Sequence, residues 1–389
     1  MKSLLRNCSH RIIGVSAFLL LLVGSAWSQG VSTSEIRGTV YDDEGMELIG
    51  ATVVATHVPS GTTYGTATDA SGRYRLPNVR VGGPYVIKAT YTGYEEKAQS
   101  GIRLNLGEPF TINFKLGEAA FELQSIEVVA ARGSSGENAG TGTSINNEAI
   151  EAMPTLNRDL NDFTRLTPQA QESFGGGFSI AGTNNRYNAI YFDGAVNNDV
   201  FGLAANGTNG GQTGIAPISI DAIDQIQVVV SPYDVSYGGF AGGGINAVTK
   251  SGTNRFEGGA YYYLQNESLA GKTNGKLTDR TGDEATRLDE FSNRLIGFNL
   301  GGPIIKDKLF FFVNAEIQNE ESPRPFEIGD YEGESSEADL DNLRNTVIDR
   351  YGYDPGPYGN KVNTLDAVRL FSKINWNINE NNDLMIRHN

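Results

Sequence analysis

The stretch Ser231–Gly252, "SPYDVSYGGFAGGGINAVTKSG", decides how this 389-residue sequence folds. It places a glycine-rich run and a lysine between two segments that have the pattern of β-strands. Such a run either cradles phosphate groups or lets a backbone bend tightly and approach its neighbours closely. The first alternative indicates a nucleotide-dependent enzyme and the second a packed β-structure, so the spacing of the glycines has to be tested.

The spacing argues against phosphate binding. A P-loop needs a lysine directly after the second glycine of G-x-x-x-x-G-K-[ST], but Gly239 and Gly244 are followed by Ile245. The "GKT" at 271–273 would need a glycine at position 266, which is Asn266. A dinucleotide-binding loop opens a helix, whereas "INAVTKSG" alternates like a strand. We therefore expect the glycines to permit close packing of the backbone.

Composition favours a mainly β protein. Glycine accounts for 48 residues, hydrophobic residues for 39% and charged residues for 20%, and Tyr and Phe are plentiful. The formal net charge is −15 at pH 7. A surface of this sign repels phosphate backbones, so nucleic acid is not an expected partner.

The N-terminus has the pattern of a signal peptide at residues 1–28. Basic residues come first, namely Lys2, Arg6 and Arg11. The apolar segment Ile12–Gly24 follows, and small residues then predict cleavage between Ser28 and Gln29. The alternative is an uncleaved membrane anchor, but this apolar run is short against the roughly 20 residues of a spanning helix.

Few side chains in the mature chain suit catalysis or metal binding. Cys8, the sole cysteine, would be lost with the signal peptide, and His57 and His388 would be the remaining histidines. A zinc site needs about three converging ligands, and a Ser/His or Cys/His nucleophilic site has few candidates here. Acidic pairs such as Asp283 and Glu284 are typical of solvated loops. We expect no catalytic residues, no cofactor and no metal.

Residues 29–118 have the pattern of a small β-sandwich. Short alternating segments such as "EIRGTVYD", "ATVVAT" and "PYVIKATYTGY" are separated by turns. A hairpin is predicted around Asp69–Gly72. The last segment, "FTINFKL", is predicted to be one strand with Phe110, Ile112, Phe114 and Leu116 on the same face.

This region resembles the carboxypeptidase-regulatory-like domain. The resemblance is carried by Ile36–Val40, Gly50–Val53, Thr68–Tyr74 and Thr92–Tyr94. It implies a non-catalytic module with a carbohydrate-binding-like fold. A rigid periplasmic spacer and a glycan-binding module both remain open.

A short strand on a flexible tether is predicted at residues 119–143. Leu123–Ala130 alternates, whereas Arg132–Thr143 is rich in Gly, Ser, Asn and Thr and should be flexible. An unpaired strand edge can recruit a partner's strand through main-chain hydrogen bonds. One hexapeptide resembles the TonB box of TonB-dependent receptors: Ser125, Ile126, Glu127, Val128, Val129 and Ala130. The alternative is a last strand of the sandwich.

Residues 144–254 predict a small α+β domain. "INNEAIEAMP" indicates a short helix ended by Pro154, and a second helix ended by Pro168 would align four apolar residues: Leu156, Leu160, Phe163 and Leu166. Tyr187–Asp199 contains Asp-Gly between strand patterns and predicts a hairpin. Ile220–Pro232 ends in a buried strand pattern.

Three ordered segments of this domain resemble the plug of TonB-dependent outer-membrane receptors. They are Arg186–Gly194, Ile223–Gly238 and Ala241–Asn254. The matching motif residues are Arg186, Asp193, Gly194, Tyr237, Gly238, Gly243, Gly244 and Asn246. The Gly/Asn-rich loop 197–216 and the "SPYDVSYG" turn depart from the usual Arg-Gly-Pro-containing pattern. They resemble the Oar-like receptors of the Bacteroidetes type, and they leave siderophore specificity open.

From residue 255 to 389 the sequence predicts the first five or so strands of a transmembrane β-barrel. In "LFFFVNAEIQ", Phe311, Val313 and Ile317 alternate with Asn314 and Glu316. Apolar residues would face lipid and polar residues the lumen, with short turns alternating with long acidic loops. A plugged transporter has about 22 strands, so we expect this chain to be the N-terminal portion of a longer receptor.

The resemblance implies an importer of the outer membrane. Its partners would be TonB with the inner-membrane energising complex, outer-membrane lipid and an unidentified ligand, and a surface lipoprotein remains an open partner. The sandwich and plug would face the periplasm. The alternative from another class is an outer-membrane adhesin or carbohydrate-binding surface protein, whose action an uncoupler of the proton gradient would leave unchanged.

Overall fold

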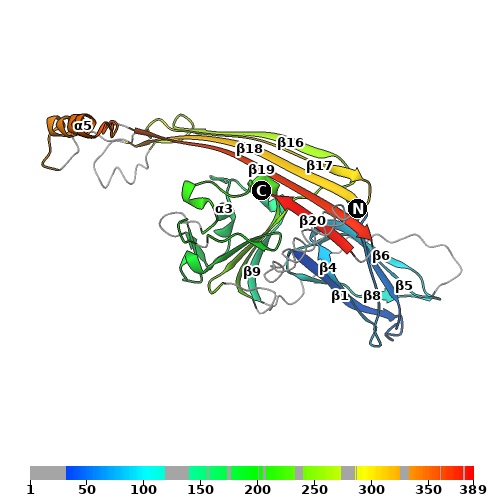
Figure 1. Cartoon of the computed structure of the whole chain (residues 1–389). Coiled ribbons are helices and arrows are strands. Elements are labelled where there is room, and N and C mark those ends of the chain that lie inside the picture. The colour runs from blue at the N-terminus through cyan, green and yellow to red at the C-terminus, as the bar shows by residue number, and fades with distance from the viewer. Residues whose placement is uncertain are drawn as a thin grey trace, which may run out of the picture. The chain divides into compact units, whose positions relative to one another are not determined.

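The computed structural model describes residues 32–118, 140–155, 157–172, 177–199, 201–204, 207–232, 240–272, 285, 287–324, 333–359, 361–379 and 382–389. Strands dominate these ranges and the helices are few, in agreement with the mainly β fold expected from the sequence (Figure 1). Within them, no helix combines the length and the apolar character needed to cross a membrane. The expected signal peptide, the hexapeptide Ser125–Ala130 and the motif residues Tyr237 and Gly238 lie outside the described residues.

Residues 33–116 form a β-sandwich, called the sandwich below. One sheet has the order β4-β1-β7, with β8 also paired to β1, and the other has the order β3-β2-β5-β6. The strands are β1 (Thr33–Asp42), β2 (Thr52–His57), β3 (Thr63–Ala67), β4 (Arg73–Arg80), β5 (Gly82–Thr90), β6 (Lys97–Leu104), β7 (Pro109–Thr111) and β8 (Phe114–Leu116). Alternate side chains enter one core, where Ile36, Val53 and Ile87 are fully buried. The period-two pattern of the sequence therefore gives the expected two-layer core.

Two local predictions for the sandwich are wrong. The turn at 69–72 does not join a paired hairpin, because β3 pairs with β2 and β4 pairs with β1 in the other sheet. The segment 109–116 is two short strands, both parallel to β1, instead of one. The break falls where the Ile112 carbonyl accepts a hydrogen bond from Tyr74 Oη (2.7 Å) and fills the space that a Cβ on Gly38 would need.

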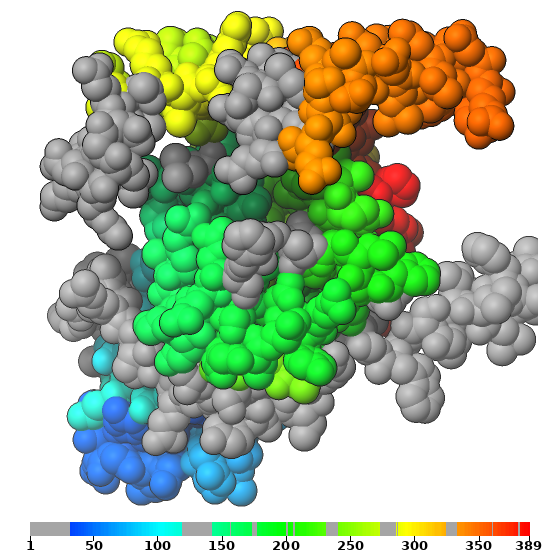
Figure 2. Space-filling view, turned by 90° about the vertical axis from the view of Figure 1, so that its left-hand side faces the viewer, coloured from blue at the N-terminus to red at the C-terminus, as the bar shows by residue number. Residues whose placement is uncertain are grey.

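Residues 140–254, called the plug region below, contain a mixed five-stranded sheet. Its order is β13-β12-β15-β14-β9. The plug region is drawn mostly in green in Figure 2. The strands are β9 (Gly140–Ile145), β12 (Ala189–Phe192), β13 (Ala195–Val196), β14 (Ile223–Pro232) and β15 (Gly244–Thr249). The central β15 is parallel to β12 and antiparallel to β14. β9 begins at Gly140, so the sheet takes up residues that the sequence pattern places in the flexible tether.

Short helices and turns cover this sheet. α2 (Asn147–Ala152) is capped at its N-terminus by Asn146, whose side chain accepts a hydrogen bond from the Ala149 amide, and it ends before Pro154 as predicted. α3 (Leu160–Thr164) is shorter than predicted: Phe163 is buried, but Leu166 lies beyond the helix and is 42% exposed. The remaining elements are β10 (Ala170–Glu172), β11 (Phe178–Ile180) and the 3-10 turns η1 (Asn185–Tyr187), η2 (Gly211–Thr213) and η3 (Ile220–Ala222).

The last part of the chain forms a sheet of long strands, called the wall sheet below. Its order is β16-β17-β18-β19-β20, and the strands run side by side with a common curve (Figure 1). They are β16 (Glu257–Asn266), β17 (Ser292–Ile305), β18 (Leu309–Arg324), β19 (Lys361–Asn379) and β20 (Asn382–His388). A long connection between β18 and β19 carries α5 (Glu337–Tyr351), whereas β17 and β18 are joined by a short turn. Short and long connections alternate as predicted for a membrane barrel.

Burial along β18 and β19 follows the predicted alternation, whereas β16 is exposed along almost its whole length. On β19, Leu370, Ile374 and Trp376 are exposed, whereas Phe371 and Lys373 are buried. On β18, Ile317 is exposed and Asn314 is buried. One face of the sheet is therefore apolar and outward, and the other carries polar groups together with a few aromatic rings.

Candidate functional site

The glycine run of the plug region provides room for packing. A Cβ on Gly243 would lie 2.5 Å from Ile180 Cγ2, and a Cβ on Gly242 would lie 2.5 Å from Asn188 Oδ1. Both neighbours are held in place: Ile180 is fully buried, and Asn188 Oδ1 accepts the Gly243 amide at 3.0 Å. All six residues of β15 are buried. A strand that is covered on both faces and paired on both edges needs small residues where it enters the sheet.

The predicted Asp-Gly turn is present and holds a buried carboxylate. Asp193 has φ 47° and Gly194 has φ 80°, the left-handed pair that a type I′ turn requires. The Asp193 carboxylate accepts the Thr249 amide at 2.9 Å and the Thr249 hydroxyl at 2.7 Å. The Asp193 side chain therefore joins the β12–β13 turn to the end of β15.

Two cations of the wall sheet also reach this carboxylate. Lys373 Nζ on β19 lies 3.1 Å from Asp193 Oδ1, and Arg387 Nε on β20 lies 3.7 Å from Asp193 Oδ2. The side chains of Lys373 and Asp193 are only 5% and 2% exposed. Of this cluster, only Asp193 was among the motif residues expected from the sequence; Lys373, Arg387 and Thr249 were not.

The remaining motif residues of the plug region lie apart from this cluster. Arg186 is exposed in η1 and donates through Nη2 to the Gly202 carbonyl at 3.2 Å, so it supports the loop that follows the hairpin. Asp199 folds the same loop by accepting the amides of Ala204 and Phe201. These amides, that of Ala204 foremost, lower the pKa of Asp199. Asn246 is fully buried in the middle of β15.

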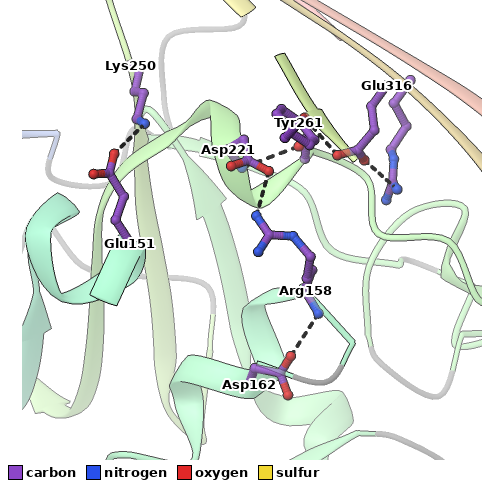
Figure 3. A network of polar contacts seen from close by, with 9 residues as sticks. Glu151, Arg158, Asp162, Asp221, Lys250, Tyr261 and Glu316 are labelled. Atoms are coloured by element: carbon purple, nitrogen blue, oxygen red, sulfur yellow. Dashed lines mark hydrogen bonds and ion pairs between the residues drawn. The ribbon is translucent and has the colours of Figure 1, made fainter. Parts of the chain in front are cut away.

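A network of polar contacts holds the helices of the plug region to its sheet (Figure 3). Arg158 points at Asp221 with Nη2 2.7 Å from Oδ2, and its own amide donates to Asp162 Oδ2 at 2.9 Å. Lys250, just after β15, lies 3.3 Å from Glu151 of α2. The Arg158–Asp221 and Lys250–Glu151 contacts join segments distant in sequence through charge-assisted bonds, in addition to the apolar packing of Ile150 and Phe163.

The inward face of the wall sheet carries a second polar group. Glu316 of β18 accepts a hydrogen bond from Tyr261 Oη at 2.9 Å and forms an ion pair with Arg369 Nη2 at 2.5 Å. Its side chain is 2% exposed. A buried carboxylate with two strong donors is satisfied, so it stiffens this face instead of serving as a reactive acid.

The described parts of the chain show no cluster of metal-ligating side chains. No group of three His, Cys, Asp or Glu side chains there is arranged to hold a metal ion. His57 Nδ1 and Ser60 Oγ are 2.7 Å apart, but both residues are buried in the sandwich. Burial lowers the pKa of His57 to about 3, so this histidine is neutral and structural at ordinary pH.

Three families match successive parts of the chain. Residues 35–117 match the carboxypeptidase regulatory-like domain, residues 134–245 the TonB-dependent receptor plug domain, and residues 248–333 an outer membrane beta barrel domain. The three matches follow the order sandwich, plug region and wall sheet. They confirm both resemblances seen in the sequence and the outer-membrane character of the last part.

Two TonB-dependent relatives match parts of the chain. The chain is 30% identical over 316 residues to the TonB-dependent transporter Oar of Myxococcus xanthus, covering 78% of this chain and 28% of that protein. It is 28% identical over 192 residues to a probable TonB-dependent siderophore receptor, PirA, of Acinetobacter baumannii, covering 46% and 23%. The crystal structure of the latter receptor has a TM-score of 0.41 and 19% identity, covering 63% of this chain and 30% of that one. This chain thus spans less than a third of the length of these relatives.

Proposed function

Because this chain combines the domains of TonB-dependent outer-membrane receptors, we propose that it works as part of an importer that uses the inner-membrane proton gradient. The observation that carries the proposal is the succession of a small, glycine-rich plug sheet and a sheet with an apolar outer and a polar inner face. The first would block a pore and the second would form part of its wall. Neither role requires a reactive side chain.

We assign the segments as follows. Residues 1–28 direct export, 29–118 form a periplasmic module, 119–143 carry the contact strand and tether, 144–254 form the plug, and 255–389 begin the barrel. The sandwich and the plug face the periplasm in this arrangement. Support comes from the mutual order of the three domain matches.

The energising partner in this proposal is TonB, which would pair with the strand Ser125–Ala130. The segment suits strand addition because four of its six residues are apolar or β-branched, and it lies directly before a Gly/Ser-rich tether. Pulling on this strand would act on β9, the first strand of the plug sheet.

Disulfide trapping in cells tests the partner. The single cysteine, Cys8, lies in the signal segment, so a Val128→Cys substitution in the full-length gene product introduces a unique thiol in residues 29–389. It should form a disulfide with a cysteine placed in the pairing strand of TonB. Val128→Cys combined with Ile126→Pro should form far less, because proline removes a main-chain donor.

Ser134→Cys, in the tether, serves as the matched control and should trap weakly. Equal trapping at positions 128 and 134 would show that no specific strand is recognised. An uncoupler of the proton gradient separates the importer from an adhesin, since it should change the Val128→Cys yield only if the contact is part of an energised cycle. An unchanged yield together with intact surface adhesion would favour the alternative function.

A further inference from the structure

Lys373 is a wall residue whose polar contacts are with the plug region. Its Nζ lies 3.1 Å from Asp193 Oδ1, 3.1 Å from the Thr249 carbonyl oxygen and 2.9 Å from Thr249 Oγ1. An ammonium group has three N–H donors, and these three acceptors account for all of them. Each acceptor belongs to the Asp-Gly turn or to the end of β15. Lys373 Nζ thus donates its hydrogen bonds to the plug region and not to neighbouring wall strands.

The register of the wall sheet adds a second, independent observation. Lys373 of β19 and Arg387 of β20 are direct cross-strand partners. Two like charges that face each other in an antiparallel pair repel, which destabilises the pair of strands. Both side chains lie on the inward face and both approach one carboxylate, that of Asp193. The plug region therefore supplies the anion that makes this arrangement of wall charges favourable.

Apolar side chains also join the wall strands to the plug region. Phe312 of β18 and Phe371 of β19 are 5% and 3% exposed and belong to the same hydrophobic cluster as Ile190, Phe192 and Ala247 of the plug region. Their rings lie 6.2 Å apart. Asp193, Thr249 and Lys373 also line a cavity of about 1070 Å³. The side chains of Lys373 and Asp193 are nevertheless only 5% and 2% exposed, and a charge pair that is buried to this extent is costly to break by removing one partner.

We propose that Lys373 and Arg387 form an anion-binding pair in the barrel wall which holds the plug in its resting place through Asp193. These two cations are positioning residues, because they act on transport by holding the plug region through Asp193. Withdrawal of Asp193 leaves the two cations facing each other, so the plug edge at β12–β13 and β15 is released as one unit. The inference rests on the proposed plug-and-barrel function for its biological meaning, but the contact itself exists independently of TonB and of any ligand.

The contact of Lys373 and Arg387 with Asp193, called the latch below, is tested by the conductance of the full-length receptor in planar lipid bilayers. Urea is added in steps to loosen the plug. Lys373→Met and Asp193→Asn should each lower the urea concentration at which channels open, and at a fixed concentration should raise the open fraction about tenfold or more, because each leaves a buried charge without its partner. Arg387→Met, whose partner is farther away, should have a smaller effect in the same direction. The double variant Asp193→Asn/Lys373→Met should open no more readily than the worse single variant.

Lys361→Met is the matched control, since Lys361 is an exposed lysine on the same strand. Barrel assembly is checked by the heat-dependent shift in gel mobility, which should be the same for all variants. Single variants that behave like Lys361→Met, or single effects that add in the double variant, would overturn the proposal. The conductance measurement uses neither TonB nor a ligand. If it confirms the latch while disulfide trapping fails, only the proposed import function is refuted. If disulfide trapping succeeds while the conductance of the variants is unchanged, only the latch is refuted.

Discussion

Gly243 lies so close to Ile180 that a Cβ atom on the glycine would be 2.5 Å from Ile180 Cγ2, whereas a Cβ on the neighbouring Gly244 would meet Phe240 at an ordinary 3.4 Å. Gly243→Ala should therefore destabilise the plug region by about 1–3 kcal/mol, because a fully buried isoleucine has to move. Gly244→Ala should change its stability by less than about 1 kcal/mol. Urea titrations of the full-length protein, read by pulsed hydrogen exchange in β12 and β15, measure both. Equal losses at the two positions would show that the run is not a packing device.

Asp162 is expected to stabilise the turn that leads into α3. Its Oδ2 accepts the amides of Asn157 and Arg158 at 2.9 Å each, and its Oδ1 pairs with Arg165. Arg158 itself has φ 52°, a left-handed conformation that these bonds stabilise. Asp162→Ala should cost roughly 2–3 kcal/mol, since it leaves two amides without their acceptor. Asp162→Asn keeps an oxygen and should cost less; the same exchange measurement on residues 157–166 ranks the two, and the reverse order would contradict this role.

The sandwich should lose stability in mild acid through His57. Burial, with a smaller contribution from Arg80, lowers its folded pKa to about 3, against 6.5 for an unperturbed histidine. The unfolded chain therefore binds an extra proton between these values, so the stabilisation is complete above pH 6.5 and falls as the pH drops toward 3. Between pH 7 and pH 4.5 the loss should be roughly 2–3 kcal/mol. His57→Asn should flatten this dependence; an unaltered slope in the variant would assign the acid sensitivity to other groups.

The connection that carries α5 should be held by one ion pair. Arg344 donates through Nε and Nη2 to the two oxygens of Asp354 at 3.0 and 2.9 Å, and this hydrogen bonding lowers the pKa of Asp354 to about 2. The clamp should be intact at and above pH 4 and fail only as the pH falls from 3.8 toward 2, since a depressed carboxyl pKa gives stability that acid removes.

Asp354→Asn should accelerate hydrogen exchange in the last turn of α5 and in residues 352–358 several-fold at pH 7. Asp349→Asn, an exposed acid on the same helix, is the control and should leave exchange unchanged. Arg344→Lys should not rescue protection, because an ammonium group lacks the fork that binds both oxygens. Full protection in Arg344→Lys would show that charge alone is enough.

Regular alternation and turn chemistry were predictable from the sequence because they depend on neighbours a few residues away. The inward and outward faces of β18 and β19 follow from whether a side chain meets lipid or the lumen. The left-handed Asp193–Gly194 pair follows from the few residue types that tolerate φ > 0. Ile245, in place of the lysine that a P-loop needs, indicated that the glycines lead into a strand, and β15 begins there.

Pairings over long distances were not predictable. Asp193 and Lys373 are 180 residues apart, and no local pattern of either segment indicates the other. The turn at 69–72 has ideal hairpin residues, yet the two strands beside it join different sheets. The split at Ile112 depends on contact with Gly38, which lies on a strand of distant sequence. In each case a tertiary contact overrides what the local segment favours.

The spatial order of the plug sheet differs from its order along the chain, and this has a consequence for biogenesis. β12–β13 and β14–β9 are two separate ladders until β15, the last of the five strands in sequence, enters between them. Gly244–Thr249 ends only eight residues before β16 starts the wall at Glu257. The plug sheet is therefore completed by the segment that leads directly into the wall sheet, so it cannot close until the chain has been made almost as far as β16.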